Sequence, residues 1–213
     1  MVIIMSFYQN AQKHFAKFLK RLFRVEVIGA HNEPETGGFI VASNHLSYFD
    51  VIILSAVFKR QIHYMAKKEL FRVPLLGRLI RAFGAFPVDR KGSAVSSLRM
   101  SIKLLEDGEC VGMFPQGHRF YGRELESTRS EVKGGVAMTA YHAKVPIVPV
   151  CIDTANNKVR MFKPTRILIG EPVPYEALGF EKGGAAEYER AALNIFDKIV
   201  DLKRQGIGEV DNG

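Results

Sequence analysis

Short apolar runs alternate with amphipathic stretches along most of the chain. Runs that are apolar throughout or alternate in polarity are typical of strands, and they cover residues 25–28, 38–42, 61–66, 85–88, 109–114, 145–152 and 163–169. Apolar residues recur at helical spacing from 47 or 48 to 58, over 74–83, 134–143 and 186–204, and in a helix that follows Ser93 and is closed by Gly108. Strands that alternate with helices predict an α/β fold with a mostly buried central sheet flanked by helices.

The N-terminal segment has a different pattern. Between Ser6 and Arg24, Phe and Leu residues recur mostly at spacings of three and four, and Lys and Arg residues lie between them. Such a helix suits the headgroup region of an anionic membrane, but it could equally pack on its own domain with a solvated basic face. We therefore divide the chain into an amphipathic helix over 1–24 and one domain over 25–213. No run reaches the roughly 18 apolar residues that a membrane-spanning helix requires.

Composition indicates a folded protein, and the charge is unevenly distributed. Apolar residues make up 47% and charged residues 24% of the 213 positions, which excludes a disordered or collagen-like chain. The formal charge is +8, with excesses of +5 in residues 1–25 and +7 in residues 59–91, whereas residues 26–58 carry −4. An excess of basic residues is compatible with nucleic acid, anionic lipid or a phosphorylated substrate, and composition does not choose among them.

Cysteine and histidine spacing gives no indication of a metal site. Cys110 and Cys151 each lie in an apolar strand-like run, and no His or second Cys follows at metal-binding spacing. We expect both to be buried core thiols and predict no metal ligands.

The strongest candidate for catalysis is His45, which is followed five residues later by Asp50 at a strand-to-helix turn. If His45 precedes the helix, the carboxylate can bond one ring nitrogen, while the other nitrogen accepts a proton. Two serines flank this histidine, but Ser43 and Ser47 do not lie in a nucleophile elbow, and Ser47 is well placed to cap the helix.

Three further stretches place candidate binding residues near that pair. Gly84 to Arg90 is a strand that ends in arginine, Phe114 to Arg119 is a strand that leaves into a glycine turn, and Val145 to Val150 is an apolar strand bracketed by prolines. Two arginines at the same sheet end as a His–Asp pair would form a site for an anionic, phosphorylated substrate.

In this order the four blocks resemble the glycerolipid acyltransferases, specifically the 1-acyl-sn-glycerol-3-phosphate (lysophosphatidate) acyltransferases. The family patterns are NHxxxxD, GxxFxxR, FPEGTRS and a V-P-[IV]-[VI]-P-V strand, and the resemblance covers roughly residues 25–180. It implies the α/β domain of that family, preceded by a membrane-associating helix.

The resemblance also implies a role for individual residues. His45 would be the general base that activates the acceptor hydroxyl, and Asp50 would orient it. The remaining residues would bind the phosphate of the acceptor: Arg90, Gln116, Gly117, Arg119 and Lys68.

The implied partners are a lysophospholipid acceptor, an acyl thioester donor (acyl-CoA or acyl-carrier protein) and an anionic membrane surface contacted by residues 1–24. The protein would then work at the cytoplasmic face of the cell membrane. We expect no further cofactor and no nucleic acid.

The third block departs from the family pattern, since Gln116 replaces Glu and His118 replaces Thr. A glutamine offers NH₂ donors in addition to a carbonyl acceptor, which leaves open a different lysolipid or an amine as acceptor. We expect His118 to be an exposed loop residue. A non-catalytic, basic membrane-binding module is the remaining alternative, although His45, Asp50, Arg90 and Arg119 are all retained.

Overall fold

The computed structural model describes residues 15–82, 84–88 and 94–210. The strands are β1 (Val25–Ile28), β2 (Phe39–Ser43), β3 (Ile62–Lys67), β4 (Phe86–Val88), β5 (Cys110–Met113), β6 (Ile147–Thr154) and β7 (Thr165–Ile169). The α-helices are α2 (Asp50–Val57), α3 (Pro74–Ala82), α4 (Ala94–Glu106), α5 (Gly135–Ala143) and α6 (Ala185–Val210). Short 3-10 helices are η1 (Ala30–Asn32), η2 (Lys68–Arg72), η3 (Glu126–Glu131), η4 (Ala155–Asn157) and η5 (Tyr175–Leu178). Every strand expected from the sequence is present; the largest difference among the helices is at α6, which continues to Val210.

The strands form one seven-stranded sheet in the order β1-β7-β6-β2-β5-β3-β4. Neighbours from β6 to β4 are parallel, whereas β7 runs antiparallel to β6 and β1 runs parallel to β7. The carboxyl ends of five strands therefore meet at one edge of the sheet. In parallel α/β sheets this edge is where binding and catalytic loops gather.

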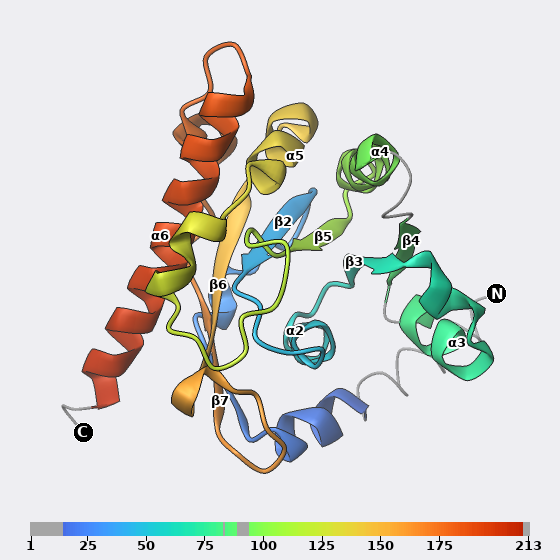
Figure 1. Cartoon of the computed structure of the whole chain (residues 1–213), viewed down its shortest axis with the longest axis vertical. Coiled ribbons are helices and arrows are strands. Elements are labelled where there is room, and N and C mark those ends of the chain that lie inside the picture. The colour runs from blue at the N-terminus through green and yellow to red at the C-terminus, as the bar shows by residue number, and fades with distance from the viewer. Residues whose placement is uncertain (1–14, 83, 89–93, 211–213) are drawn as a thin grey trace.

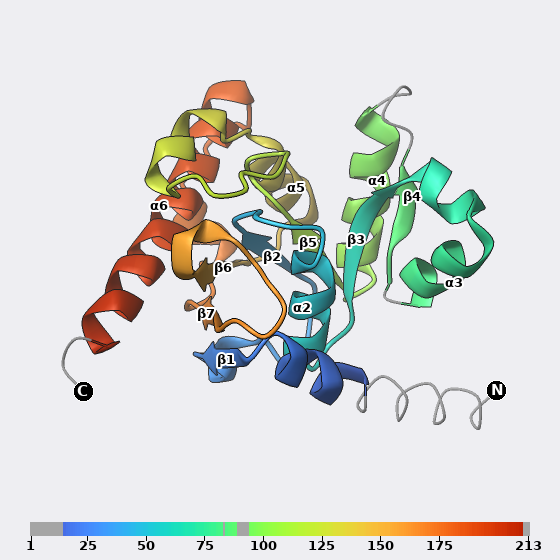
Figure 2. The same ribbon diagram turned by 60° about the horizontal axis from the view of Figure 1, so that its bottom comes forward.

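Two hydrophobic clusters cover the two faces of the sheet. Along β2, Ile40 and Ala42 pack on the side of α5 and α6, whereas Phe39 and Val41 pack on the side of α2. The ribbon views show the three layers, with α5 and α6 on one side of the sheet and α2 on the other (Figures 1 and 2). The predicted α/β fold with a buried central sheet is confirmed.

The described part of the N-terminal segment is helical over residues 15–22 and lies below α2 and beside β1 (Figure 2). Leu19 and Phe23 are buried in the same cluster as α2, whereas Phe18 is 58% exposed. Residues 1–14, which carry the first part of the predicted membrane helix, lie outside the described residues. Within the described part of the chain, no helix is both long and apolar enough to cross a bilayer.

Both cysteines are buried, as predicted. Cys110 lies in β5 and Cys151 in β6, and neither thiol is exposed. Burial raises the pKa of Cys110 to about 12 and raises that of Cys151 as well. The thiols therefore stay protonated and act as core residues.

Candidate active site

His45 and Asp50 form a hydrogen-bonded pair at the carboxyl edge of the sheet. The imidazole Nδ1 lies 2.8 Å from Asp50 Oδ2. The Asp50 side chain is completely buried, and that of His45 is 12% exposed. The same oxygen accepts backbone N–H bonds from Leu46 at 2.6 Å and from Ser47 at 2.8 Å. One carboxylate oxygen thus holds both the ring and the loop that carries it.

The five-residue spacing works because His45 precedes the helix. Residues 44–49 connect β2 to α2, and α2 begins at Asp50 itself. The prediction that Ser47 caps this helix is wrong: the residue before the first helical position is Phe49, and Ser47 Oγ instead accepts its N–H at 3.2 Å. The carboxylate of Asp50, at the first position of α2, therefore holds the N–H groups of the preceding loop and the histidine ring at once.

Asn44 holds the base of this loop, a role that the sequence reasoning did not assign. Its Nδ2 donates to the carbonyl of Ile152 at 2.9 Å, and its Oδ1 accepts the N–H of Ile152 at 2.7 Å. The side-chain amide of Asn44 therefore pairs with the backbone of Ile152 in β6, at the point where β2 ends and backbone pairing between the two strands stops. Its position as the first letter of the NHxxxxD block was the available signal.

The third block fixes the backbone of His45 from both sides. The N–H of His45 donates to Gln116 Oε1 at 3.0 Å, and its carbonyl accepts the N–H of Phe120 at 2.8 Å. Gln116 is only 1% exposed, and its Nε2 donates to Thr128 Oγ1 at 2.6 Å. Both polar atoms of the amide are thus engaged, so the structure does not support the expected phosphate contact by Gln116. This residue positions the histidine loop.

Replacing Gln116 by leucine is expected to lower transferase activity about tenfold and stability by about 1–3 kcal/mol, because the His45 N–H and the Thr128 hydroxyl would each lose a buried partner. Glutamate at this position can still accept from His45 and should keep more activity than leucine. Steady-state rates and urea unfolding of both variants test this order. Equal losses in the two variants would contradict it.

Aromatic packing supports one face of the imidazole. The ring of Phe114 stacks on His45 with centroids 3.8 Å apart and planes 12° apart, and Tyr64 stacks behind Phe114 at 6.1 Å. A side chain at Gly112 would collide with the Tyr64 ring. Burial, and secondarily the charge of Asp50, raise the pKa of Tyr64, so its phenol stays neutral. The imidazole is thus supported by Phe114, with Tyr64 behind it.

Arg119 contacts the NHxxxxD block, which carries the His45–Asp50 pair (the dyad). Its guanidinium carbon lies 3.5 Å from the centre of the Tyr48 ring. Gly117 has φ +72°, and no atom lies within 4 Å of the position that a Cβ would take, so the turn is open at this residue. His118 is exposed, as expected, with its ring 4.3 Å from Phe120.

The two remaining phosphate candidates lie on the β3–β4 side. Lys68 is half-buried at the start of η2, directly after the carboxyl end of β3. Arg90 lies outside the described residues. Among the described residues, no group of three His, Cys, Asp or Glu side chains is placed to hold a metal ion.

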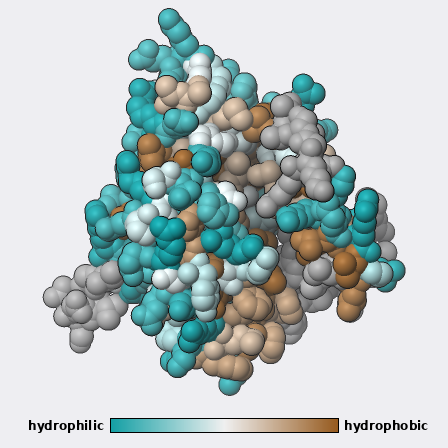
Figure 3. Space-filling model, viewed as in Figure 1, coloured by the Kyte–Doolittle hydropathy of each residue, from teal (hydrophilic) through white to brown (hydrophobic). Residues whose placement is uncertain are grey.

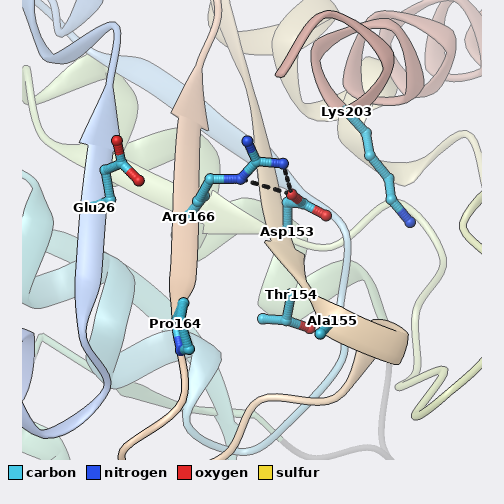
Figure 4. A pocket seen from close by; sticks show the side chains of 7 residues that line it. All are labelled: Glu26, Asp153, Thr154, Ala155, Pro164, Arg166 and Lys203. Carbon is cyan, nitrogen blue, oxygen red and sulfur yellow. Dashed lines mark hydrogen bonds and ion pairs between the residues drawn. The ribbon is translucent and has the colours of Figure 1, made fainter. Parts of the chain in front are cut away.

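A separate pocket of about 350 Å³ lies between the β6–β7 side of the sheet and α6 (Figure 4). Arg166 Nε donates to Asp153 Oδ2 at 3.0 Å, and its Nη1 donates to the carbonyl of Gly206 at 2.6 Å. Lys203 approaches from α6, with its Nζ bonded to Asn157 at 2.8 Å. The ion pair of Arg166 with Asp153 joins β7 to β6, and α6 binds this region through the Gly206 carbonyl and Lys203. The dyad is not among the lining residues.

Comparison with known proteins identifies the family of the chain. A model of the Acyltransferase family matches residues 24–153, which contain the four blocks. The 1-acyl-sn-glycerol-3-phosphate acyltransferase of Bacillus subtilis (strain 168) is 38% identical over 152 residues, covering 70% of this chain and 73% of the relative. The chain belongs to the 1-acyl-sn-glycerol-3-phosphate acyltransferase family. The enzyme of that name from Saccharomyces cerevisiae is 30% identical over 188 residues, which is 85% of this acyltransferase and 60% of the yeast protein.

The fold of the family is also shared. The crystal structure of the 1-acyl-sn-glycerophosphate (LPA) acyltransferase from Thermotoga maritima matches with a TM-score of 0.64 and 26% identity, over 95% of this acyltransferase and 82% of that chain. The resemblance drawn from the four sequence blocks is therefore confirmed, and the chain is an O-acyltransferase.

Proposed function

We propose that this acyltransferase moves an acyl chain from a thioester, either acyl-CoA or acyl-carrier protein, to the free sn-2 hydroxyl of 1-acyl-sn-glycerol-3-phosphate. The product would be phosphatidic acid. Family membership supports the acceptor class. The observation that carries the chemistry is the bond between His45 and Asp50 at the open edge of the sheet.

The hydrogen bonds around Asp50 identify the tautomer of His45. Asp50 Oδ2 accepts two backbone N–H bonds, so it acts as an acceptor, and Nδ1 of the imidazole must carry the proton that the third bond needs. The other ring nitrogen, Nε2, then carries the lone pair. Nε2 has no hydrogen-bond partner within the described ranges, which leaves it available as a base.

In the proposed reaction, Nε2 of His45 removes the proton of the acceptor hydroxyl as its oxygen attacks the thioester carbonyl carbon. Asp50 stabilises the imidazolium that forms. The C–S bond breaks, the leaving thiolate takes the proton back from His45, and an ester and a free thiol result. The step needs no acyl-enzyme, because the base acts directly on the acceptor.

The acceptor phosphate would bind at Arg119, at the open backbone of Gly117 and near Lys68. The guanidinium gives paired, charge-assisted hydrogen bonds to phosphate oxygens. Arg90 is added to this set on the family resemblance alone. The +7 charge of residues 59–91 would raise the local concentration of an anionic acceptor.

The buried position of Gln116 bears on the choice of acceptor. The replacement of Glu by Gln suggested a different lysolipid or an amine acceptor. Since the Gln116 amide binds His45 and Thr128 inside the protein, this replacement gives no reason to expect a different acceptor.

We further propose that residues 1–24 contact an anionic membrane at the cytoplasmic face of the cell. The described part of this segment supports the idea: Leu19 packs inward, whereas Phe18 and the bases Lys17 and Arg21 face outward. An apolar edge among cations is typical of interfacial helices.

A product assay tests the acceptor. The purified chain is incubated with one acyl-CoA and, in separate reactions, with lysophosphatidate, lysophosphatidylcholine or a long-chain amine. We expect phosphatidic acid formation to exceed the other reactions by at least about tenfold, because only lysophosphatidate presents a terminal phosphate to the basic site. Equal rates with all acceptors would contradict the proposal.

Replacing Arg119 by alanine is expected to raise KM for lysophosphatidate by about ten- to a hundredfold, because charge-assisted bonds to the phosphate are lost. Arg123 is a matched control, since it is an exposed arginine whose guanidinium lies 5.1 Å from the Phe120 ring. Its replacement by alanine should leave KM nearly unchanged. An equal rise in both variants would indicate that Arg119 contributes only general positive charge.

A further inference from the structure

The loop between β6 and β7 exposes two neighbouring apolar side chains among basic ones. Met161 is 52% and Phe162 is 69% exposed. Lys158, Arg160 and Lys163 lie in the same six residues, and this stretch contains no acidic residue. We call residues 158–163 the Phe162 loop.

The backbone of Phe162 takes a conformation that does not suit an aromatic residue. Its φ is +63°, in the left-handed region where a Cβ is crowded and glycine or asparagine is favoured. The exposed ring contributes little burial that could offset this strain. A strained, exposed aromatic residue is a reason to look for a role outside the core of the domain.

The Phe162 loop is fixed to the N-terminal helix. The N–H of Phe162 donates to the carbonyl of Leu22 at 2.6 Å. Helix 15–22 carries the exposed Phe18 and, with its following turn, the bases Lys17, Arg21 and Arg24. The two segments lie at the lower end of the molecule, where apolar side chains border hydrophilic ones (Figures 1 and 3).

Exposed aromatic residues continue from this end to the active site. Phe49 is exposed at the start of α2, and its ring lies 5.1 Å from that of Phe23 at the end of the N-terminal helix. On the other side, Lys158 Nζ lies 5.1 Å from the Tyr121 ring, which follows the third block. Tyr48, next to Phe49, is in turn covered by Arg119.

We propose that the Phe162 loop is a second membrane contact, which inserts Met161 and Phe162 into the headgroup region of an anionic bilayer beside the N-terminal helix. The charge fits this partner, because the three bases of the loop extend the basic surface of residues 15–24. Aromatic and basic residues with apolar stems are suited to the boundary between water and lipid. The inference rests on the proposed action on a lipid acceptor, and this contact would hold the dyad edge near the bilayer.

Vesicle binding without substrates tests the contact on the full chain. The probe is a vesicle of equal parts phosphatidylcholine and phosphatidylglycerol, and the bound fraction is measured by sedimentation. Phe162→Gly removes the ring and fits the left-handed backbone, so it should unfold no earlier than the parent chain. We expect it to lower the vesicle partition coefficient about tenfold, because an inserted aromatic side chain is lost.

A matched pair of methionine variants distinguishes an effect of the Phe162 loop on vesicle binding from a general effect of exposed apolar surface. Met161→Ser should weaken binding, whereas Met100→Ser should not. Met100 is 47% exposed on α4, and α4 packs with α5 on the face of the sheet opposite to α2 and the N-terminal helix. Unchanged partitioning of Phe162→Gly and Met161→Ser would overturn the proposal, as would an equal loss in Met100→Ser. A change of oligomeric state by light scattering without a change in vesicle binding would also overturn it, in favour of a self-association surface.

The same variants distinguish this contact from the proposed reaction. Phe162→Gly should keep its rate on water-soluble short-chain donor and acceptor and lose rate only on vesicles. Absence of transferase activity in the parent chain would reject the proposed function, yet the vesicle binding measurements would still decide whether the Phe162 loop contacts lipid.

Discussion

Replacing His45 by alanine is expected to lower kcat by about 10²–10⁴, the range that general base catalysis contributes. The variant removes the imidazole whose Nδ1 bonds Asp50 and whose Nε2 would accept the proton, while the buried carboxylate keeps its two backbone partners. Release of free thiol from acyl-CoA, measured in the presence and absence of lysophosphatidate, reports the rate. Circular dichroism and thermal unfolding establish that the fold persists.

His118 provides the control for this experiment. It is a second histidine beside the same site, but its ring is exposed and lies against Phe120. His118→Ala should keep the rate within about threefold, because an exposed loop side chain contributes little to a positioned proton transfer. Retained activity in His45→Ala would reject the assignment of the base, and an equal loss in both variants would show that neither histidine has a specific role.

Replacing Asp50 by asparagine is expected to lower kcat at least about a hundredfold, because the imidazolium loses its negative partner. The amide oxygen can still accept the bonds of Leu46, Ser47 and the His45 ring. Its NH₂ group would take the place of Oδ1, which is buried without a hydrogen-bond partner within the described residues, at a cost of about 1–3 kcal/mol. Rates and urea unfolding, measured on the same variant, distinguish the loss of the negative charge in catalysis from a loss of folded protein.

Two comparisons make the Asp50 result specific. Asp50→Ala removes all three hydrogen bonds and should be the less stable variant. Asp153→Asn alters another buried carboxylate, paired with Arg166 away from the dyad, and should lower stability while the folded fraction keeps its activity. If Asp50→Asn retained the parent rate, the negative charge would have no part in catalysis.

Strand and helix positions were predictable because each depends on a local pattern. The apolar run that forms β6 identifies a buried strand by itself, and in the structure all eight of its residues are buried. The start of α2 was less predictable. Ser47 is a good cap by residue type, but the residue before the first helical position is Phe49, and the Asp50 carboxylate accepts the N–H groups of Leu46 and Ser47 in the loop. Which side chain reaches a given backbone N–H depends on a distance in the folded chain, and the sequence does not fix that distance.

By itself, the sequence determined the α/β class, the histidine and aspartate of the dyad and the family, because apolar periodicity and short motifs are properties of neighbouring residues. Only the tertiary structure decided the contacts of Gln116, whose buried amide bonds the His45 backbone and the Thr128 hydroxyl. It also joined the Phe162 loop to the N-terminal helix through one hydrogen bond between residues 140 positions apart. Burial and long-range contacts depend on how the whole chain packs, and no local pattern records them.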